Sequence, residues 1–147
     1  MDCILCKIKE QTVPYSGVIA KTKYWTIMVS REQHTLGTLI VFHNTHTVRF
    51  SSISKQALLE FQHIQVTFEK ALSSLFNPDL FNYLQCGNQV EHLHFHLIPR
   101  YKSSRNYHNQ EFVDINYGNS VKETHKITSD AFITLLKHSI QCEIHPF

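Results

Sequence analysis

The chain has 147 residues, of which 42% are hydrophobic and 18% charged, and its formal net charge is +2. This length and composition predict one soluble globular domain, and the near balance of charge gives no electrostatic case for a nucleic-acid partner. No apolar run approaches the roughly 20 residues that span a bilayer, and Met1-Asp2-Cys3 lacks the basic start of a secretory signal, so we expect a cytoplasmic protein.

Four segments have the composition of β-strands. Aromatic and β-branched residues at 24–30 and apolar residues at 38–42 predict two strands on either side of a polar turn. Residues 80–86 predict a third strand, and a turn at Gly87-Asn88 leads into a fourth at 92–98.

Two segments have helical periodicity. Ser54 is the expected N-cap of a helix of about five turns that ends at Asn77-Pro78-Asp79, and a second helix is expected near 129–141. The first helix should bury one stripe of apolar residues: Ala57, Leu58, Phe61, Ile64, Phe68, Ala71, Leu72 and Leu75. Residues 101–128 are polar and are expected to be irregular.

This order of elements predicts an α+β domain with a largely antiparallel sheet, because strands joined by tight turns are interrupted by one long helix. We expect a single domain over residues 1–147. Its core should span about 3–101, and 102–147 should form a C-terminal extension with the last helix.

Three histidines alternate with apolar residues in the run His92-Leu93-His94-Phe95-His96-Leu97. Successive side chains of a strand point to opposite faces, so the imidazoles should share one face and the apolar side chains should enter the core. Burying all three imidazoles in a core would require three buried partners. A metal site is possible, but the pattern favours covalent catalysis, in which one neutral imidazole attacks phosphorus and a neighbour protonates the leaving group.

Two cysteines near the start, Cys3 and Cys6, form a C-x-x-C pair. A redox role is disfavoured because no strand precedes the pair, whereas two thiolates and two imidazoles complete a tetrahedral zinc site. The candidate partners are His43, His46 and His92. The remaining cysteines, Cys86 and Cys142, are expected to be packing residues.

Other polar residues near the histidine run are candidates for phosphate binding. Gly87 permits close backbone approach, and the Asn88 amide can donate to a phosphoryl oxygen, although Gly-Asn also suits a simple hairpin turn. Arg100 either binds phosphate or caps the strand. The other histidines are expected to be solvated: His34, His63, His108, His125, His138 and His145.

Together these residues resemble the histidine triad (HIT) family, whose signature of three histidines alternating with apolar residues matches His92 to Ile98. The continuation Pro99-Arg100-Tyr101 is similar to a common bacterial form. The opening Cys3-Ile4-Leu5-Cys6 resembles zinc-bearing members, and the segment from Gly37 to His46 resembles the family's second-strand region.

The resemblance implies a five-stranded antiparallel sheet with a long helix and a C-terminal helix, and usually a homodimer. It implies hydrolysis or transfer of nucleotidyl groups at the α-phosphate of dinucleoside polyphosphates or nucleoside phosphoramidates. By this match His94 is the nucleophile, His96 contacts phosphate, and His92 orients the others or ligates zinc. The implied set of ligands for one structural zinc ion is Cys3, Cys6, His46 and His92.

Three positions depart from the family pattern. Thr38 stands where many members carry a fourth histidine, Ser30 where an acid often binds the ribose, and Asn88 where a glutamine often precedes the triad. These departures bear on the substrate more than on the chemistry. Residues 112–118 are a candidate cover for the nucleotide.

Three classes of function follow from these features. The leading hypothesis is a zinc-containing nucleotide hydrolase or transferase that uses His94. The second is a nucleotide-binding sensor or interaction module with little turnover, which the changes at Thr38 and Ser30 favour. The third is a metal-binding protein whose histidine run is itself the metal site.

Overall fold

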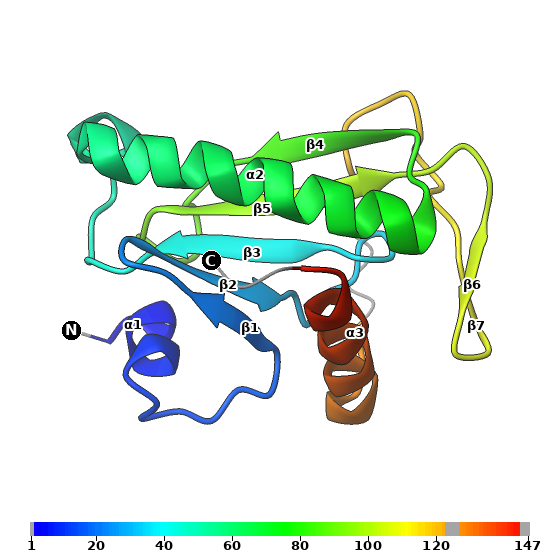
Figure 1. Cartoon of the computed structure of the whole chain (residues 1–147), viewed down its shortest axis with the longest axis horizontal. Coiled ribbons are helices and arrows are strands. Elements are labelled where there is room, and N and C mark those ends of the chain that lie inside the picture. Colours follow the sequence, from blue (N-terminus) through cyan, green and yellow to red (C-terminus); the bar gives the residue numbers. More distant parts are fainter. Residues whose placement is uncertain (1, 123–126, 145–147) are drawn as a thin grey trace.

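The computed structural model describes residues 2–122 and 127–144. Its central sheet has the strand order β1-β2-β3-β5-β4, and every neighbouring pair is antiparallel (Figure 1). The bounds of these strands are β1 Val18–Lys21, β2 Trp25–Val29, β3 Leu39–His43, β4 Leu80–Leu84 and β5 His94–Arg100. The α+β class and the five-stranded antiparallel sheet are therefore confirmed.

The two predicted helices form where their caps indicated. Helix α2, Lys55–Phe76, begins after Ser54, whose side chain accepts a hydrogen bond from the Ala57 N–H, and it ends at Asn77, whose φ of 47° is left-handed. Helix α3, Asp130–Glu143, begins after Ser129, which accepts from the Phe132 N–H.

Five short elements were not predicted from the local sequence, among them strand β1. Helix α1, Ile4–Lys9, contains the second cysteine of the C-x-x-C pair, and a 3-10 turn, η1, covers Phe50–Ser52. Residues 101–128, expected to be irregular, contain a hairpin made of β6, Arg105–Tyr107, and β7, Gln110–Phe112. Within the described ranges, no helix is both long enough and apolar enough to cross a membrane.

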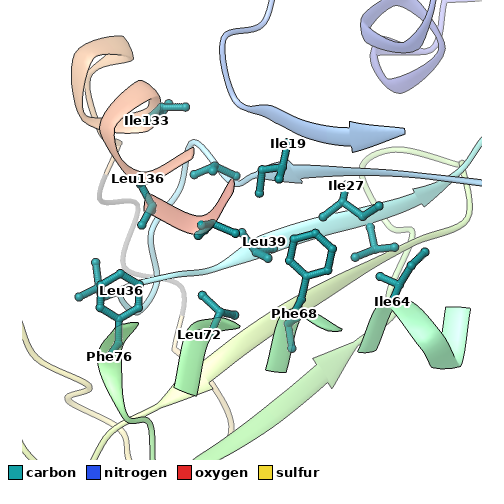
Figure 2. Packing of buried hydrophobic residues seen from close by; sticks show 14 of the residues in the cluster. Ile19, Ile27, Leu36, Leu39, Ile64, Phe68, Leu72, Phe76, Ile133 and Leu136 are labelled. Carbon is teal, nitrogen blue, oxygen red and sulfur yellow. The ribbon is translucent and has the colours of Figure 1, made fainter. Parts of the chain in front are cut away.

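Helices α2 and α3 cover one face of the sheet and bury the main core against it. Figure 2 shows side chains of α2, among them Phe68 and Leu72, directed at Ile27 and Leu39 of the sheet, with Leu136 of α3 beside them. Trp25 is fully buried, and its ring N–H donates to the Ala57 carbonyl over 2.8 Å. One member of the predicted stripe, Leu58, is instead 46% exposed.

The opposite face of the sheet carries α1 and a smaller apolar cluster of Cys3, Leu5, Met28 and Phe42. On β3, Phe42 and Ile40 lie opposite His94 and His96 of β5. Since opposed residues of an antiparallel pair share a face, these two imidazoles point away from α2. Phe95 points the other way, with its ring centroid 4.5 Å from that of Phe61 on α2. The alternation of faces is confirmed, but β5 begins at His94, so His92 precedes the strand rather than lying within it.

Candidate active site and metal group

The face of the sheet that carries His94 and His96 borders a cavity of about 510 Å³. One wall is the segment that follows β2, from Ser30 to His34, and another is the turn from Cys86 to Val90. Helix α1 and the sheet contribute apolar side chains to the lining: Ile4, Leu5, Ile8, Met28 and Ile40. The cavity therefore combines an apolar slot with two imidazoles.

The main chain selects one tautomer of the His94 imidazole. Its Nδ1 lies 2.6 Å from the carbonyl oxygen of His92. A carbonyl oxygen only accepts, so Nδ1 carries a proton, and in the neutral ring Nε2 therefore keeps a free lone pair. The His94 side chain lines the cavity. A neutral imidazole with Nε2 unprotonated is the nucleophilic form of histidine.

The imidazole of His96 also lines the cavity, and its ring centroid lies 5.3 Å from that of His94. Burial, and to a smaller extent the neighbouring His94 and His34, lower the pKa of His96 to about 4. At neutral pH this ring is therefore uncharged, and its role is to give or accept a hydrogen bond rather than to supply a fixed positive charge.

Four side chains beside the cavity form a group that can hold one metal ion: Cys3, Cys6, His46 and His92. Their ligand atoms all lie within 4.8 Å of one another. The His92 Nδ1 is 3.3 Å from the Cys3 sulfur, and the His46 Nδ1 is 3.5 Å from the Cys6 sulfur. Tetrahedral zinc, with bonds of about 2.3 Å to sulfur and 2.0 Å to nitrogen, places such atoms about 3.5 Å apart, so this set of donors fits zinc.

The orientation of His92 suits a metal ligand. Its Nε2 lies 2.7 Å from the carbonyl oxygen of His43, so Nε2 carries the proton and Nδ1 directs its lone pair at the two cysteine sulfurs. Burial lowers the pKa of His92, which favours the neutral form that binds metal. His43, the other candidate ligand, is outside the group, because its Nδ1 contacts the Thr45 carbonyl oxygen instead.

The turn at Gly87-Asn88 lines the cavity, with Gly87 at a φ of +69°, which only glycine adopts without strain. Ser30 also lines it, at the end of β2. Thr38 is fully buried, and its hydroxyl donates to the Thr35 carbonyl within the turn between β2 and β3.

Arg100 is not among the residues that line the cavity, and its contacts are with neighbouring segments of the chain. The side chain is 2% exposed, and its Nε lies 2.6 Å from Oδ2 of Asp114. The guanidinium also donates to the Asn82 side chain and to the carbonyls of Asn116 and Asn119. Arg100 thus connects the segment after β7 to the end of β5. Residues 112–118, the candidate cover for the nucleotide, are not among the residues that line the cavity.

Several other sequence expectations are corrected by the structure. Cys86 and Cys142 are exposed rather than packed, and Cys86 lies at the cavity. His34 was expected to be solvated, but its side chain is only 7% exposed and it lines the cavity beside His96. The exposure of three other histidines is confirmed: His63, His108 and His138. The last two, His125 and His145, lie outside the described residues.

The burial of His34 had no signal in the sequence, because it depends on how the turn between β2 and β3 folds. Helix α1 was missed for a similar reason. Its six residues are too few for a helical period, although the C-x-x-C spacing indicated that the segment binds metal.

The antiparallel sheet thus presents two imidazoles beside a Cys₂His₂ group, and the comparison with known sequences identifies the family. A family model described as the HIT domain matches residues 11–103. The chain therefore belongs to the HIT domain family.

Similar proteins differ from this chain in most positions. It is 27% identical to Protein hit of Bacillus subtilis over 105 residues, which are 68% of this chain and 72% of that protein. It is 28% identical to adenosine 5'-monophosphoramidase HNT1 of Saccharomyces cerevisiae over 103 residues, 67% of this chain and 62% of that protein. The match thus spans less than two thirds of the length of the yeast enzyme.

The fold is shared with solved structures of the same family. A zinc-bound histidine triad family protein from Mycobacterium smegmatis superposes with a TM-score of 0.68, covering 97% of this chain and 93% of that one. At 17% sequence identity, this likeness establishes the fold alone.

We predict that His96 stays uncharged down to acidic pH. Its pKa is about 4 in the folded protein and about 6.5 in an unfolded chain, so between these values the unfolded state binds more protons. The contribution of this ring to stability is then complete above pH 6.5 and is lost as the pH falls towards 4. An NMR titration of the His96 ring should give a midpoint near 4, and a midpoint near 6.5 would contradict the environment described.

Proposed function

We propose that the protein cleaves nucleotide conjugates at the α-phosphate, with His94 as the covalent nucleophile. The observation that carries this proposal is the hydrogen bond from His94 Nδ1 to the His92 carbonyl, because it fixes the lone pair on Nε2 in a ring that lines the cavity. The substrates proposed are nucleoside phosphoramidates and dinucleoside polyphosphates. Membership of the HIT family and the similarity to a yeast adenosine monophosphoramidase support this class.

In the first step, His94 Nε2 attacks the α-phosphorus. A nitrogen–phosphorus bond forms, and the bond from phosphorus to the amine or phosphate leaving group breaks, so that the leaving group departs with the bonding electron pair and takes up a proton from solvent. In the second step, water attacks the phosphorus and gives up a proton to solvent, the nitrogen–phosphorus bond breaks with its electron pair returning to Nε2, and a nucleoside monophosphate is released. Two steps with a covalent intermediate replace one difficult displacement.

The other cavity residues bind and orient the nucleotide in this proposal. His96, uncharged at neutral pH, donates a ring N–H to a phosphoryl oxygen, and the Asn88 amide and the backbone at Gly87 also contact the phosphate. The apolar slot lined by Ile8, Met28 and Ile40 takes the base, since such a slot buries a flat aromatic group well. Arg100 has no part in binding, because Asp114 and its neighbours already engage its guanidinium.

Replacing His94 should abolish turnover. We expect His94→Ala to lower kcat/KM at least about a thousandfold while nucleotide binding is largely kept, because the variant lacks the attacking nitrogen. The assay compares wild-type and variant protein on an adenosine phosphoramidate, diadenosine tri- and tetraphosphate and an adenylated sulfate. His138→Ala, a change at an exposed histidine of α3, is the matched control and should keep the wild-type rate.

Either of two outcomes would contradict the enzyme proposal. A wild-type rate in His94→Ala would exclude His94 as the nucleophile. Nucleotide binding without cleavage of any compound by the wild type would favour the second candidate function, a nucleotide-binding module. That alternative draws on Ser30, a neutral residue that is 3% exposed at the position where family members often carry an acid.

We further propose that Cys3, Cys6, His46 and His92 hold one structural zinc ion. The donor set and its spacing support zinc, as does the zinc-bound family structure from M. smegmatis. The ion would connect the N-terminal segment to the residue that positions His94. Burial and the neighbouring Cys3 raise the pKa of the Cys6 thiol in the metal-free protein, so zinc binding there would release protons and weaken in acid.

The purified protein should contain one zinc ion per chain. In Cys3→Ser the ion should be lost and Tm lowered by about 10 °C, because metal binding energy is folding energy at such a site. Elemental analysis and thermal unfolding measure both effects. Cys142→Ser, at an exposed cysteine of α3, is the control and should retain the metal. Wild-type protein whose Tm is unchanged after chelation would remove the zinc proposal.

We also propose that the protein forms a homodimer through the β4 edge of the sheet and the adjoining side of α2. Among the described strands, β4 pairs only with β5. Its residues Leu80 and Leu84 are each 42% exposed to solvent. The Tyr83 hydroxyl donates to Glu69 on α2, so the side of α2 that carries Glu69 lies beside β4. That side also exposes Val66, which is 55% accessible. An unpaired edge next to exposed apolar residues favours association.

A charge placed on this edge should separate the dimer. We expect the wild type to sediment at about twice its chain mass of 17.2 kDa and Leu84→Lys to sediment as a monomer. Leu135→Lys changes an equally exposed leucine, 42% accessible, on α3 and should leave the dimer intact. A monomeric wild type, or equal dissociation of both variants, would contradict the proposed interface.

A further inference from the structure

His34 is a histidine of the cavity that lies outside the HIT signature. It is located in the turn between β2 and β3, its side chain is 7% exposed, and it lines the cavity. The ring centroids of His34 and His96 are 6.3 Å apart, with 41° between the ring planes. His96 thus contacts two imidazoles, those of His94 and His34.

The backbone that carries His34 is held by buried side chains. The side-chain nitrogen Nε2 of Gln33 donates to the carbonyl oxygens of Ser30 and Thr38, over 2.8 and 2.9 Å. The Thr38 hydroxyl donates to the carbonyl oxygen of Thr35, and all four of these side chains are buried. His34 therefore has a fixed position against His96, since the turn on either side of it is closed by hydrogen bonds.

The Nδ1 atoms of the two histidines require the same kind of partner, a hydrogen-bond donor. His34 Nε2 lies 3.9 Å from the carboxylate of Glu32, whose negative charge favours a proton on Nε2 and leaves Nδ1 as an acceptor. Nδ1 of His34 and Nδ1 of His96 are both buried, and neither has a hydrogen-bond partner among the described residues. Buried polar atoms are rarely left unpaired, because the loss of hydration is costly.

We propose that His34 is a positioning residue that acts through His96, by means of one water molecule that donates a hydrogen bond to Nδ1 of each ring. A water molecule has two donors, so one molecule satisfies both of these buried acceptors. Because this bridge makes Nδ1 of His96 an acceptor, the His96 proton resides on Nε2. This inference rests on the proposed function, in which Nε2–H of His96 faces the phosphoryl group.

Three substitutions separate this role from simple packing. His34→Asn places an amide oxygen near the position of Nδ1 and can accept from the same water. His34→Gln carries its amide farther out, and His34→Phe keeps the ring shape without any acceptor. His138→Phe is the matched control at an exposed histidine.

We expect His34→Phe to lower kcat about tenfold with KM within a factor of about three, as for the loss of one orienting hydrogen bond. His34→Asn should retain most of the rate, His34→Gln should be intermediate, and His138→Phe should equal the wild type. A wild-type rate in His34→Phe would overturn the proposal. Equal losses in the Phe and Asn variants, accompanied by a lower Tm in both, would also overturn it, since they would indicate a packing role.

Nitrogen-15 NMR of the His96 ring provides a measurement that does not depend on turnover. The wild type and His34→Asn should show the proton on Nε2, whereas His34→Phe should show a mixture of the two tautomers. If the wild type cleaves no compound but these spectra differ as expected, the proposed function fails while the coupling of His34 to His96 stands. Identical tautomers in wild type and His34→Phe would overturn the coupling itself.

Discussion

His92 connects the metal group to the candidate nucleophile through three of its polar atoms. Its carbonyl oxygen accepts the 2.6 Å hydrogen bond from His94 Nδ1, its Nε2 donates to the His43 carbonyl, and its Nδ1 faces the cysteine sulfurs. If His92 moved, His94 would lose the hydrogen bond that selects its tautomer, and the candidate metal ligands would lose their spacing. The position of His92 just before β5, rather than within it, allows its backbone and its ring to serve two sites at once.

One face of the sheet packs against the core helices, and the other face borders the cavity. Helices α2 and α3 bury their apolar stripes against one face, where Phe95 and Leu97 of β5 also point. The other face is left for the cavity, with α1 supplying both an apolar wall and one cysteine of the metal group. Because β5 lies between β3 and β4 inside the sheet, the backbone at His96 is paired on both sides, and the backbone at His94 is paired with Phe42 of β3. Rigid support of this kind is what a site for covalent catalysis needs.

The parts of the site that follow local periodicity could be predicted from the sequence. The alternation of His94, Phe95 and His96 determines which side chains share a face, and the caps Ser54 and Ser129 mark the two long helices correctly. The four candidate metal ligands came from the family resemblance, and their ligand atoms do lie together.

The parts that depend on distant contacts could not be predicted in this way. Nothing local distinguishes a solvated His34 from a buried one, since its burial depends on packing beside His96 of the distant strand β5. The role of Arg100 likewise depends on Asp114, which is 14 residues away and reached only through the β6–β7 hairpin.

The measurement that tests the central claim most directly is the chemical identity of the reaction intermediate. Wild-type protein mixed with an adenosine phosphoramidate and quenched in alkali within milliseconds should carry one adenylyl group, and peptide mass spectrometry should place it on His94. The modified peptide should appear and decay at rates consistent with turnover. Cleavage that proceeds with no adduct, or an adduct located on His96, would contradict the account of how His92 prepares His94 for attack.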